Sequence, residues 1–277
     1  MAENWLQRGE LLLGEEKQRI LAGAHILVIG LGGVGSWAAE MLCRAGVGTF
    51  TLVDADVVDV TNINRQMPAL ASTVGRPKCD VVAERLRAIN PDVQLVVKQQ
   101  FVTPDNIAQL LDEQQFAFVV DAIDTLESKC ALIRACWERG LKIISSMGAG
   151  AKCDLAAIRS GDLWKTEHCT LAKNVRRQLR DVRGRKLPVI YSAEEPRRDA
   201  IRPNPVGGKP IIGSKDNKIP AALSCFDVPL IHQQFIGVCH RDQPHTQLLC
   251  HGALGWQFTT QGVDSADNRL SHLLIQL

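Results

Sequence analysis

A glycine-rich hexapeptide constrains the fold of this chain more than any other feature. The segment GLGGVG occupies residues 30–35, with glycines at Gly30, Gly32, Gly33 and Gly35. The apolar, β-favouring run at 25–29 predicts a buried strand before it, and the helical spacing of 36–45 predicts a helix after it. Residues 50–54 predict a second strand. This order forms a βαβ unit, with parallel strands and a right-handed crossover.

The alternation of helices and strands continues along the chain. Two short helices are expected within residues 3–22, ahead of the first strand. Further helices are predicted at 78–89, 104–113 and 128–139, and further strands at 93–98, 116–121 and 142–146. This order is typical of the α/β class, with a doubly wound, mostly parallel, Rossmann-type sheet.

The pattern changes beyond residue 152. We expect a basic helix at 171–180, a strand at 187–192 and a proline- and glycine-rich loop at 196–208. From residue 215 onward charges become sparse, and neither helical nor strand periodicity emerges. The sequence therefore predicts an α/β domain at 1–214, which includes the basic insert, and an irregular C-terminal segment at 215–277.

Composition indicates an ordinary globular protein with a formal net charge of +2. No apolar run approaches the ~18 residues that a membrane helix needs, and the N-terminus lacks the features of a secretory signal. We therefore expect a cytoplasmic location. The nine cysteines show no compact ladder of spacings, and Cys43, Cys130 and Cys136 lie in helix-like apolar patterns that predict burial.

Basic residues are concentrated in one part of the chain, where they predict either a phosphate-binding surface suited to RNA or a solvated basic face. They are Lys173, Arg176, Arg177, Arg180, Arg183, Arg185, Lys186, Arg197, Arg198 and Arg202.

The glycine loop predicts a nucleotide site. Its glycines permit a tight turn and a close approach of backbone to phosphate, and the following helix N-terminus presents amides to an anion. Asp54 ends the next strand, where a ribose hydroxyl is held in such folds. These features alone do not choose between a nicotinamide cofactor and ATP.

Three further residues favour ATP. Arg65 lies in a polar loop, Lys78 begins a helix and Asp124 follows a strand, so all three are expected at the carboxyl edge of the sheet. A triphosphate needs cations and a carboxylate that holds Mg²⁺, whereas hydride transfer needs neither. A nicotinamide oxidoreductase is therefore the weakest interpretation.

With these residues in place, the chain resembles the ubiquitin-activating-enzyme-like superfamily of ThiF- and MoeB-type adenylating enzymes. The resemblance rests on the glycine loop, Asp54, the segment TNINRQ at 61–66, Lys78 and Asp124. Within it, the chain looks most like the tRNA threonylcarbamoyladenosine dehydratase branch. Four local matches support that branch, at residues 30–39, 101–106, 148–150 and 189–194.

The resemblance implies a role for each candidate residue. Asp54 would bind the ribose, and Asp56 is a further candidate for the nucleotide site. Phosphate binding is implied for Asn62, Arg65 and Lys78, and Mg²⁺ binding for Asp124. Arg8 matches an arginine that reaches the ATP of the other subunit in such dimers, which implies a homodimer and an arginine finger in trans.

The reaction that the resemblance implies is the ATP-dependent dehydration of threonylcarbamoyladenosine in tRNA through an acyl-adenylate. One alternative is an adenylyltransferase that activates the C-terminal carboxylate of a small sulfur-carrier or ubiquitin-like protein. Another is a nucleotide-binding protein without turnover. A sulfur-acceptor protein is a further candidate partner.

Missing cysteine pairs favour the tRNA-modifying branch. The sulfur-carrier adenylyltransferases usually carry two Cys-x-x-Cys pairs for structural zinc, and this chain has none. The later group Cys239, His240, His245, Cys250 and His251 matches no common zinc template, so structural zinc is not expected.

Overall fold

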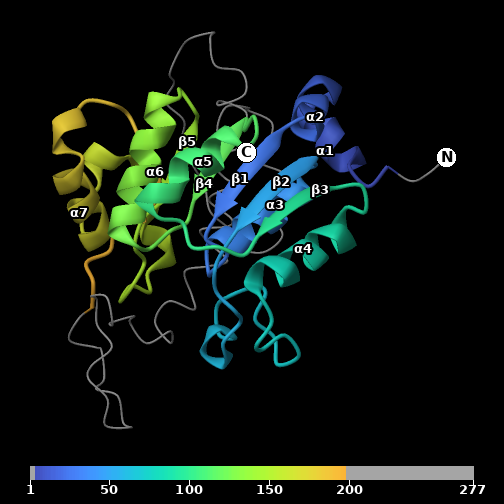
Figure 1. The fold of residues 1–277 in the computed structure, drawn as a ribbon, viewed down its shortest axis with the longest axis horizontal. Coiled ribbons are helices and arrows are strands. Elements are labelled where there is room, and N and C mark those ends of the chain that lie inside the picture. The colour runs from blue at the N-terminus through green and yellow to red at the C-terminus, as the bar shows by residue number, and fades with distance from the viewer. Residues whose placement is uncertain (1–3, 198–277) are drawn as a thin grey trace.

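A computed structural model describes residues 4–197 and shows one mostly parallel, seven-stranded sheet with helices on both faces (Figure 1). The strand order is β3-β2-β1-β4-β5-β7-β6. The strands are β1 (His25–Ile29), β2 (Thr49–Val53), β3 (Gln94–Lys98), β4 (Phe118–Asp121), β5 (Ile143–Ser146), β6 (Ile158–Asp162) and β7 (Pro188–Ser192). Only β6 runs antiparallel, against β7, so the predicted doubly wound sheet is confirmed.

Seven α-helices connect and cover the strands. They are α1 (Gln7–Leu13), α2 (Glu15–Ala22), α3 (Gly35–Arg44), α4 (Lys78–Ile89), α5 (Pro104–Asp112), α6 (Leu126–Glu138) and α7 (Thr170–Gln178). Short 3₁₀ turns occur at Val60–Asn62, Leu155–Ala157, Leu163–Lys165 and Arg180–Val182. The basic helix predicted at 171–180 therefore ends at Gln178 and is followed by a separate turn.

Two apolar cores lie on the two faces of the sheet, because successive strand residues point to opposite sides. In β1, Ile26 and Val28 pack with α3 and α4, whereas Leu27 and Ile29 pack with α5, α6 and α7. The layers are visible in Figure 1, where α5, α6 and α7 lie to one side of the strands. A double-sided sheet of this kind exposes its strand ends, where ligands bind in such folds.

The predicted burial of three cysteines is confirmed. Cys43, Cys130 and Cys136 are buried in these cores. Burial raises the pKa of the Cys43 and Cys130 thiols to about 11 and that of Cys136 to about 12, because a thiolate loses its hydration there.

Some sequence predictions lie outside the described residues. They include the boundary at 214, the segment 215–277 and the histidines and cysteines within it. Among the helices of residues 4–197, none is long and apolar enough to span a bilayer. The cytoplasmic location stays a prediction.

Candidate nucleotide site

Close contacts between backbone atoms hold the glycine loop in place. Gly30 has a φ of +88°, and a Cβ on it would lie 2.7 Å from the Ala122 carbonyl oxygen. A Cβ on Gly35 would lie only 1.8 Å from the Gly30 carbonyl oxygen. The loop therefore closes onto itself and onto the segment that follows β4, which no side chain at these two positions permits.

The N-terminus of α3 offers amides to an anion. Its N-cap residue, Val34, provides no side-chain hydrogen bond to the first turn. Within residues 4–197, the amides of Gly32, Gly33 and Val34 donate no hydrogen bond. Because the first amides of a helix have no partner of their own, this turn can bind a phosphate.

Asp54 anchors the glycine loop. One carboxylate oxygen accepts a hydrogen bond from the Leu31 amide at 2.6 Å, and the other accepts one from the Asp56 amide at 2.8 Å. The carboxylate thus joins the end of β2 to the loop after β1. A carboxylate accepts about four hydrogen bonds, so Asp54 retains capacity for the predicted ribose contact.

Lys78 lies directly beyond the end of β2. Its side chain is buried, and its Nζ lies 2.7 Å from the Asp56 carboxylate, which is half exposed. The Lys78 amide also donates to the Asp56 carbonyl at 3.0 Å. Asp56 therefore offsets the charge of Lys78, and its place in the nucleotide site stays a prediction.

The polar loop between β2 and α4 positions Asn62 and Arg65. Asp59 caps its 3₁₀ turn, and the Thr61 hydroxyl and amide lower the pKa of that carboxyl by donating to it. The Asn62 side chain accepts from the Asp59 amide at 3.1 Å. The Trp37 indole donates to the Arg65 carbonyl at 3.3 Å, which ties the loop to the first turn of α3.

Gln66 is a further candidate residue of the nucleotide site, and no sequence pattern singled it out. Its side chain lies against Gly32, and its Oε1 atom is buried without a hydrogen-bond partner in the described part of the chain. A buried acceptor of this kind needs a donor. Its place in the polar segment at 61–66 was the only signal that could have indicated it.

A buried ion pair supports the segment that follows β4. Asp121, the last residue of β4, and Lys129 of α6 are both fully buried, with Nζ and Oδ2 2.7 Å apart. Lys129 also donates to the Ser145 hydroxyl at 3.1 Å and to the Ser146 carbonyl at 3.0 Å. The second Asp121 oxygen accepts from the Ile123 amide at 3.0 Å, so this pair fixes the backbone that leads to Asp124.

Asp124 lies three residues beyond the end of β4, and its side chain is exposed. Within residues 4–197 its carboxylate accepts no hydrogen bond and forms no ion pair. Strand β1 is flanked by β2 and β4, all three parallel, so the segments after them share one edge. The structure thus brings the glycine loop, Asp54, Lys78 and the Asp124 segment to one edge.

Arg8 is not brought to this edge within one chain. It is exposed on α1, and the preceding Leu6 lies against Gly46. Gly46 precedes β2, whereas Asp54 follows it. Arg8 therefore belongs to the opposite end of the strands, and only a second subunit could carry it to this nucleotide site.

Comparison with known proteins decides the family, because a model of the ThiF family matches residues 6–187. The chain belongs to the ThiF family. It is 44% identical over 183 residues to the tRNA threonylcarbamoyladenosine dehydratase of Escherichia coli, which covers 65% of this chain and 68% of that protein. The Bacillus subtilis enzyme of the same name is 43% identical over 190 residues, covering 68% and 74%.

Solved structures give the same result for this ThiF-family chain. The E. coli dehydratase in complex with ATP matches it with a TM-score of 0.67 at 36% identity, covering 87% of this chain and 99% of that one. A sulfur-carrier adenylyltransferase of E. coli is 34% identical over 133 residues and covers 48% and 52%. The two bacterial dehydratases are thus more similar to this chain than that adenylyltransferase, both in identity and in span.

The closure of the loop predicts the effect of adding one methyl group. Gly35→Ala should lower ATP affinity at least tenfold and destabilise the fold by about 1–3 kcal/mol, because the new Cβ meets the Gly30 carbonyl. Gly161→Ala is the control, since its Cβ would lie at an ordinary 3.7 Å from Tyr191. Calorimetric ATP titration and urea unfolding measure both; wild-type ATP affinity in Gly35→Ala would contradict this account.

The buried pair predicts a second, non-additive effect. Lys129→Met should lower the free energy of unfolding by about 3–5 kcal/mol at neutral pH, because it leaves the Asp121 charge buried without a cation. Adding Asp121→Asn should restore more than half of that loss, since the amide is neutral and its oxygen still accepts from Ile123. Urea unfolding of both variants tests this, and a loss below about 1 kcal/mol in the single variant would refute it.

Proposed function

We propose that this chain uses ATP to dehydrate threonylcarbamoyladenosine in tRNA. The observation that carries the proposal is the 44% identity over 183 residues to an enzyme named for that reaction. The family match at 6–187 spans every candidate site residue. The same E. coli enzyme has been solved with ATP and with AMP, which supports a nucleotide that is cleaved at its α-phosphate.

The proposed reaction has two steps. The threonine carboxylate of the modified adenosine attacks the α-phosphate of ATP, which forms an acyl-adenylate and releases pyrophosphate. The neighbouring carbamoyl group then closes onto the activated carbonyl and expels AMP. One oxygen of the carboxylate leaves with AMP, so the nucleoside loses one water and no nucleophile from the protein is needed.

The described residues suit the first step. The uncapped first turn of α3 would bind phosphate oxygens, and Arg65 and Lys78 would offset the charge that builds at the α-phosphate. The Lys78 ammonium pairs with the Asp56 carboxylate, which is half exposed. If Lys78 turned from Asp56 to a phosphate, the Asp56 charge would remain in contact with solvent and would not be a buried, unpaired anion.

Gln66 supports a nucleoside beside the glycine loop. Its unpartnered Oε1 accepts hydrogen bonds only, so a phosphate cannot satisfy it at neutral pH. A ribose hydroxyl or an adenine amino group can. With the Asp54 carboxylate this gives two acceptors for the nucleoside and several donors for the phosphates.

Asp124 fits a Mg²⁺ ion that arrives with the nucleotide. Magnesium is usually held by one or two carboxylates together with substrate phosphates. Within residues 4–197 no group of three or more His, Cys, Asp or Glu could hold a metal by itself, and the exposed Asp124 carboxylate is a donor of the required type. Bound there, the ion would offset negative charge on the phosphates.

We extend the proposal to a homodimer in which Arg8 serves the site of the partner subunit. Seven of the nine exposed large apolar side chains of residues 4–197 lie on two segments, and exposed apolar surface often marks an interface. One segment is α1, which carries Arg8, and the other is the loop that carries Asn62 and Arg65. The apolar residues are Leu11 and Leu12 on α1 and Val57, Val60, Ile63, Leu70 and Val74 on the loop.

Pyrophosphate release tests the proposed function. With tRNA that carries threonylcarbamoyladenosine, Lys78→Ala should slow the release on the order of a hundredfold, as expected when one cation is removed from the transferring phosphate. Lys142→Ala is the matched control, because Lys142 precedes β5 at the opposite edge of the sheet. Release that needs a small carrier protein and ignores tRNA would contradict the proposal, as would ATP binding without release.

A further inference from the structure

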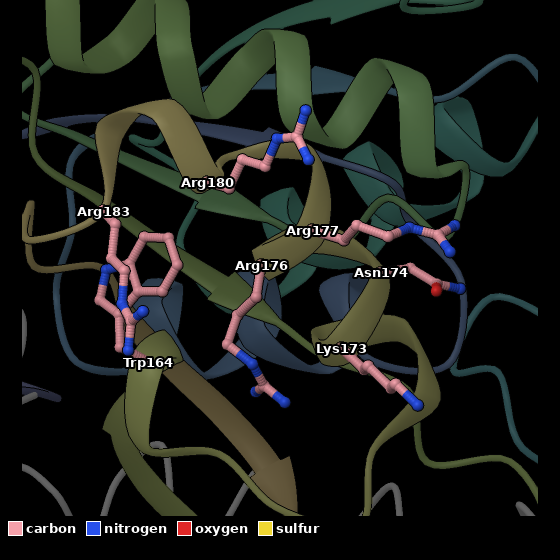
Figure 2. A pocket seen from close by; sticks show the side chains of 7 residues that line it. All are labelled: Trp164, Lys173, Asn174, Arg176, Arg177, Arg180 and Arg183. Carbon is pink, nitrogen blue, oxygen red and sulfur yellow. The ribbon is translucent and has the colours of Figure 1, made fainter.

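A basic hollow lies at α7 (Figure 2), and none of its lining residues belongs to the nucleotide site described above. It has a volume of about 460 Å³ and involves α7 and the turns on either side of it. Its lining residues are Trp164, Lys173, Asn174, Arg176, Arg177, Arg180 and Arg183. We call this set the α7 basic surface.

Four cations of the α7 basic surface are available to a ligand. Within residues 4–197, no hydrogen bond or ion pair engages the side chains of Lys173, Arg177, Arg180 and Arg183. Arg176 differs, because it donates to the Leu163 and Thr166 carbonyls and so braces the preceding turn. Lys173 and Arg177 lie one helical turn apart on α7, and Arg180 begins the 3₁₀ turn that follows the helix.

Asp181, which follows Arg180 in the chain, is paired mainly with a cation outside this group. Asp181 forms two hydrogen bonds with Arg134 of α6, at 2.7 and 2.6 Å. These bonds are the main reason that the pKa of Asp181 falls to about 2. Between residues 164 and 186 the only other acid is Glu167, against eight lysines and arginines. The surface therefore keeps a large local excess of positive charge.

The α7 basic surface begins near the edge of the sheet that carries the nucleotide site. The Cys169 thiol, at the N-cap of α7, donates to the Gly148 carbonyl at 3.5 Å, and Gly148 follows the carboxyl end of β5. The other end of α7 is joined to α6 through Arg134, which donates to the Gln178 carbonyl. Helix α7, which carries these cations, thus extends from near this edge of the sheet to its contact with α6.

We propose that the α7 basic surface binds the sugar-phosphate backbone of the RNA substrate. This inference rests on the proposed function. A group of cations without side-chain partners suits a polyanion, and phosphate contacts need no apolar anchor. Protein interfaces and membrane-binding helices bury several apolar side chains, whereas the lining of this surface contains one large apolar side chain, Trp164.

The indole of Trp164 suits the same partner. Its N–H donates to the Arg185 carbonyl at 2.7 Å, so the hydrogen-bonding capacity of the ring is satisfied within the protein. The part of the ring that lines the hollow offers an apolar face, and nucleotides stack on such faces.

Two matched double variants test the proposal. Arg177→Gln with Arg180→Gln removes two charges from the surface, and Arg19→Gln with Arg87→Gln removes two exposed charges from α2 and α4. The first should weaken binding of tRNA that carries threonylcarbamoyladenosine about tenfold and reduce the slope of log K against log salt by about 1–2. The second double variant should leave the tRNA affinity and the salt slope unchanged. Each double variant should keep the wild-type Kd for ATP.

Equal tRNA affinity and salt slope in the two variants would overturn the inference and would favour an acidic protein as the partner of this surface. Because binding is measured without turnover, the outcome is separate from that of the proposed function. A wild-type chain that binds tRNA through α7 yet releases no pyrophosphate would refute the proposed reaction alone.

Discussion

The nucleotide site depends on the close approach of three backbone segments at the carboxyl edge of the sheet. Gly30 turns the chain with a positive φ, Gly35 starts α3 against the Gly30 carbonyl, and Ala122 lies against both. This contact brings the N-terminus of α3 beside the ends of β2 and β4. The Asp54 carboxylate and the Asp121–Lys129 pair then hold the two neighbouring segments, one through the Leu31 amide and one through a buried charge pair.

The arrangement separates charges by function. In the proposed function, the α3 amides and Lys78 would supply positive charge for phosphates, and Asp54 and Gln66 would supply acceptors for a nucleoside. A second basic region lies farther out on α7 and is not needed to hold a nucleotide. An enzyme that acts on a modified base in a large RNA has to bind two polyanions, and two separate basic regions allow each to be bound without competing with the other.

Local patterns were sufficient to predict the parallel strands and the glycine loop, because a strand buried on both faces and a βα turn each leave a short-range signature. They were not sufficient for β6. Its segment, IRSGD, is an edge strand with exposed polar residues, and it exists because of pairing with β7 about thirty residues later along the chain. The burial of Lys129 could not be predicted either, since a lysine within a helix usually faces solvent and only the tertiary fold brings Asp121 to it.

The roles given to Asn62, Arg65 and Asp124 stay predictions. Asp56 pairs with Lys78, a partner that lies too far along the sequence to be predicted from local patterns.

Mass spectrometry of tRNA nucleosides can show whether the chain uses ATP to activate a carboxylate of a tRNA nucleoside. Wild-type protein is incubated with ATP, Mg²⁺ and tRNA that carries threonylcarbamoyladenosine, and the tRNA is then digested to nucleosides. We expect a product that is lighter than threonylcarbamoyladenosine by one water and that is absent when ATP is left out. Unchanged threonylcarbamoyladenosine in the presence of protein that binds both ATP and the tRNA would contradict it.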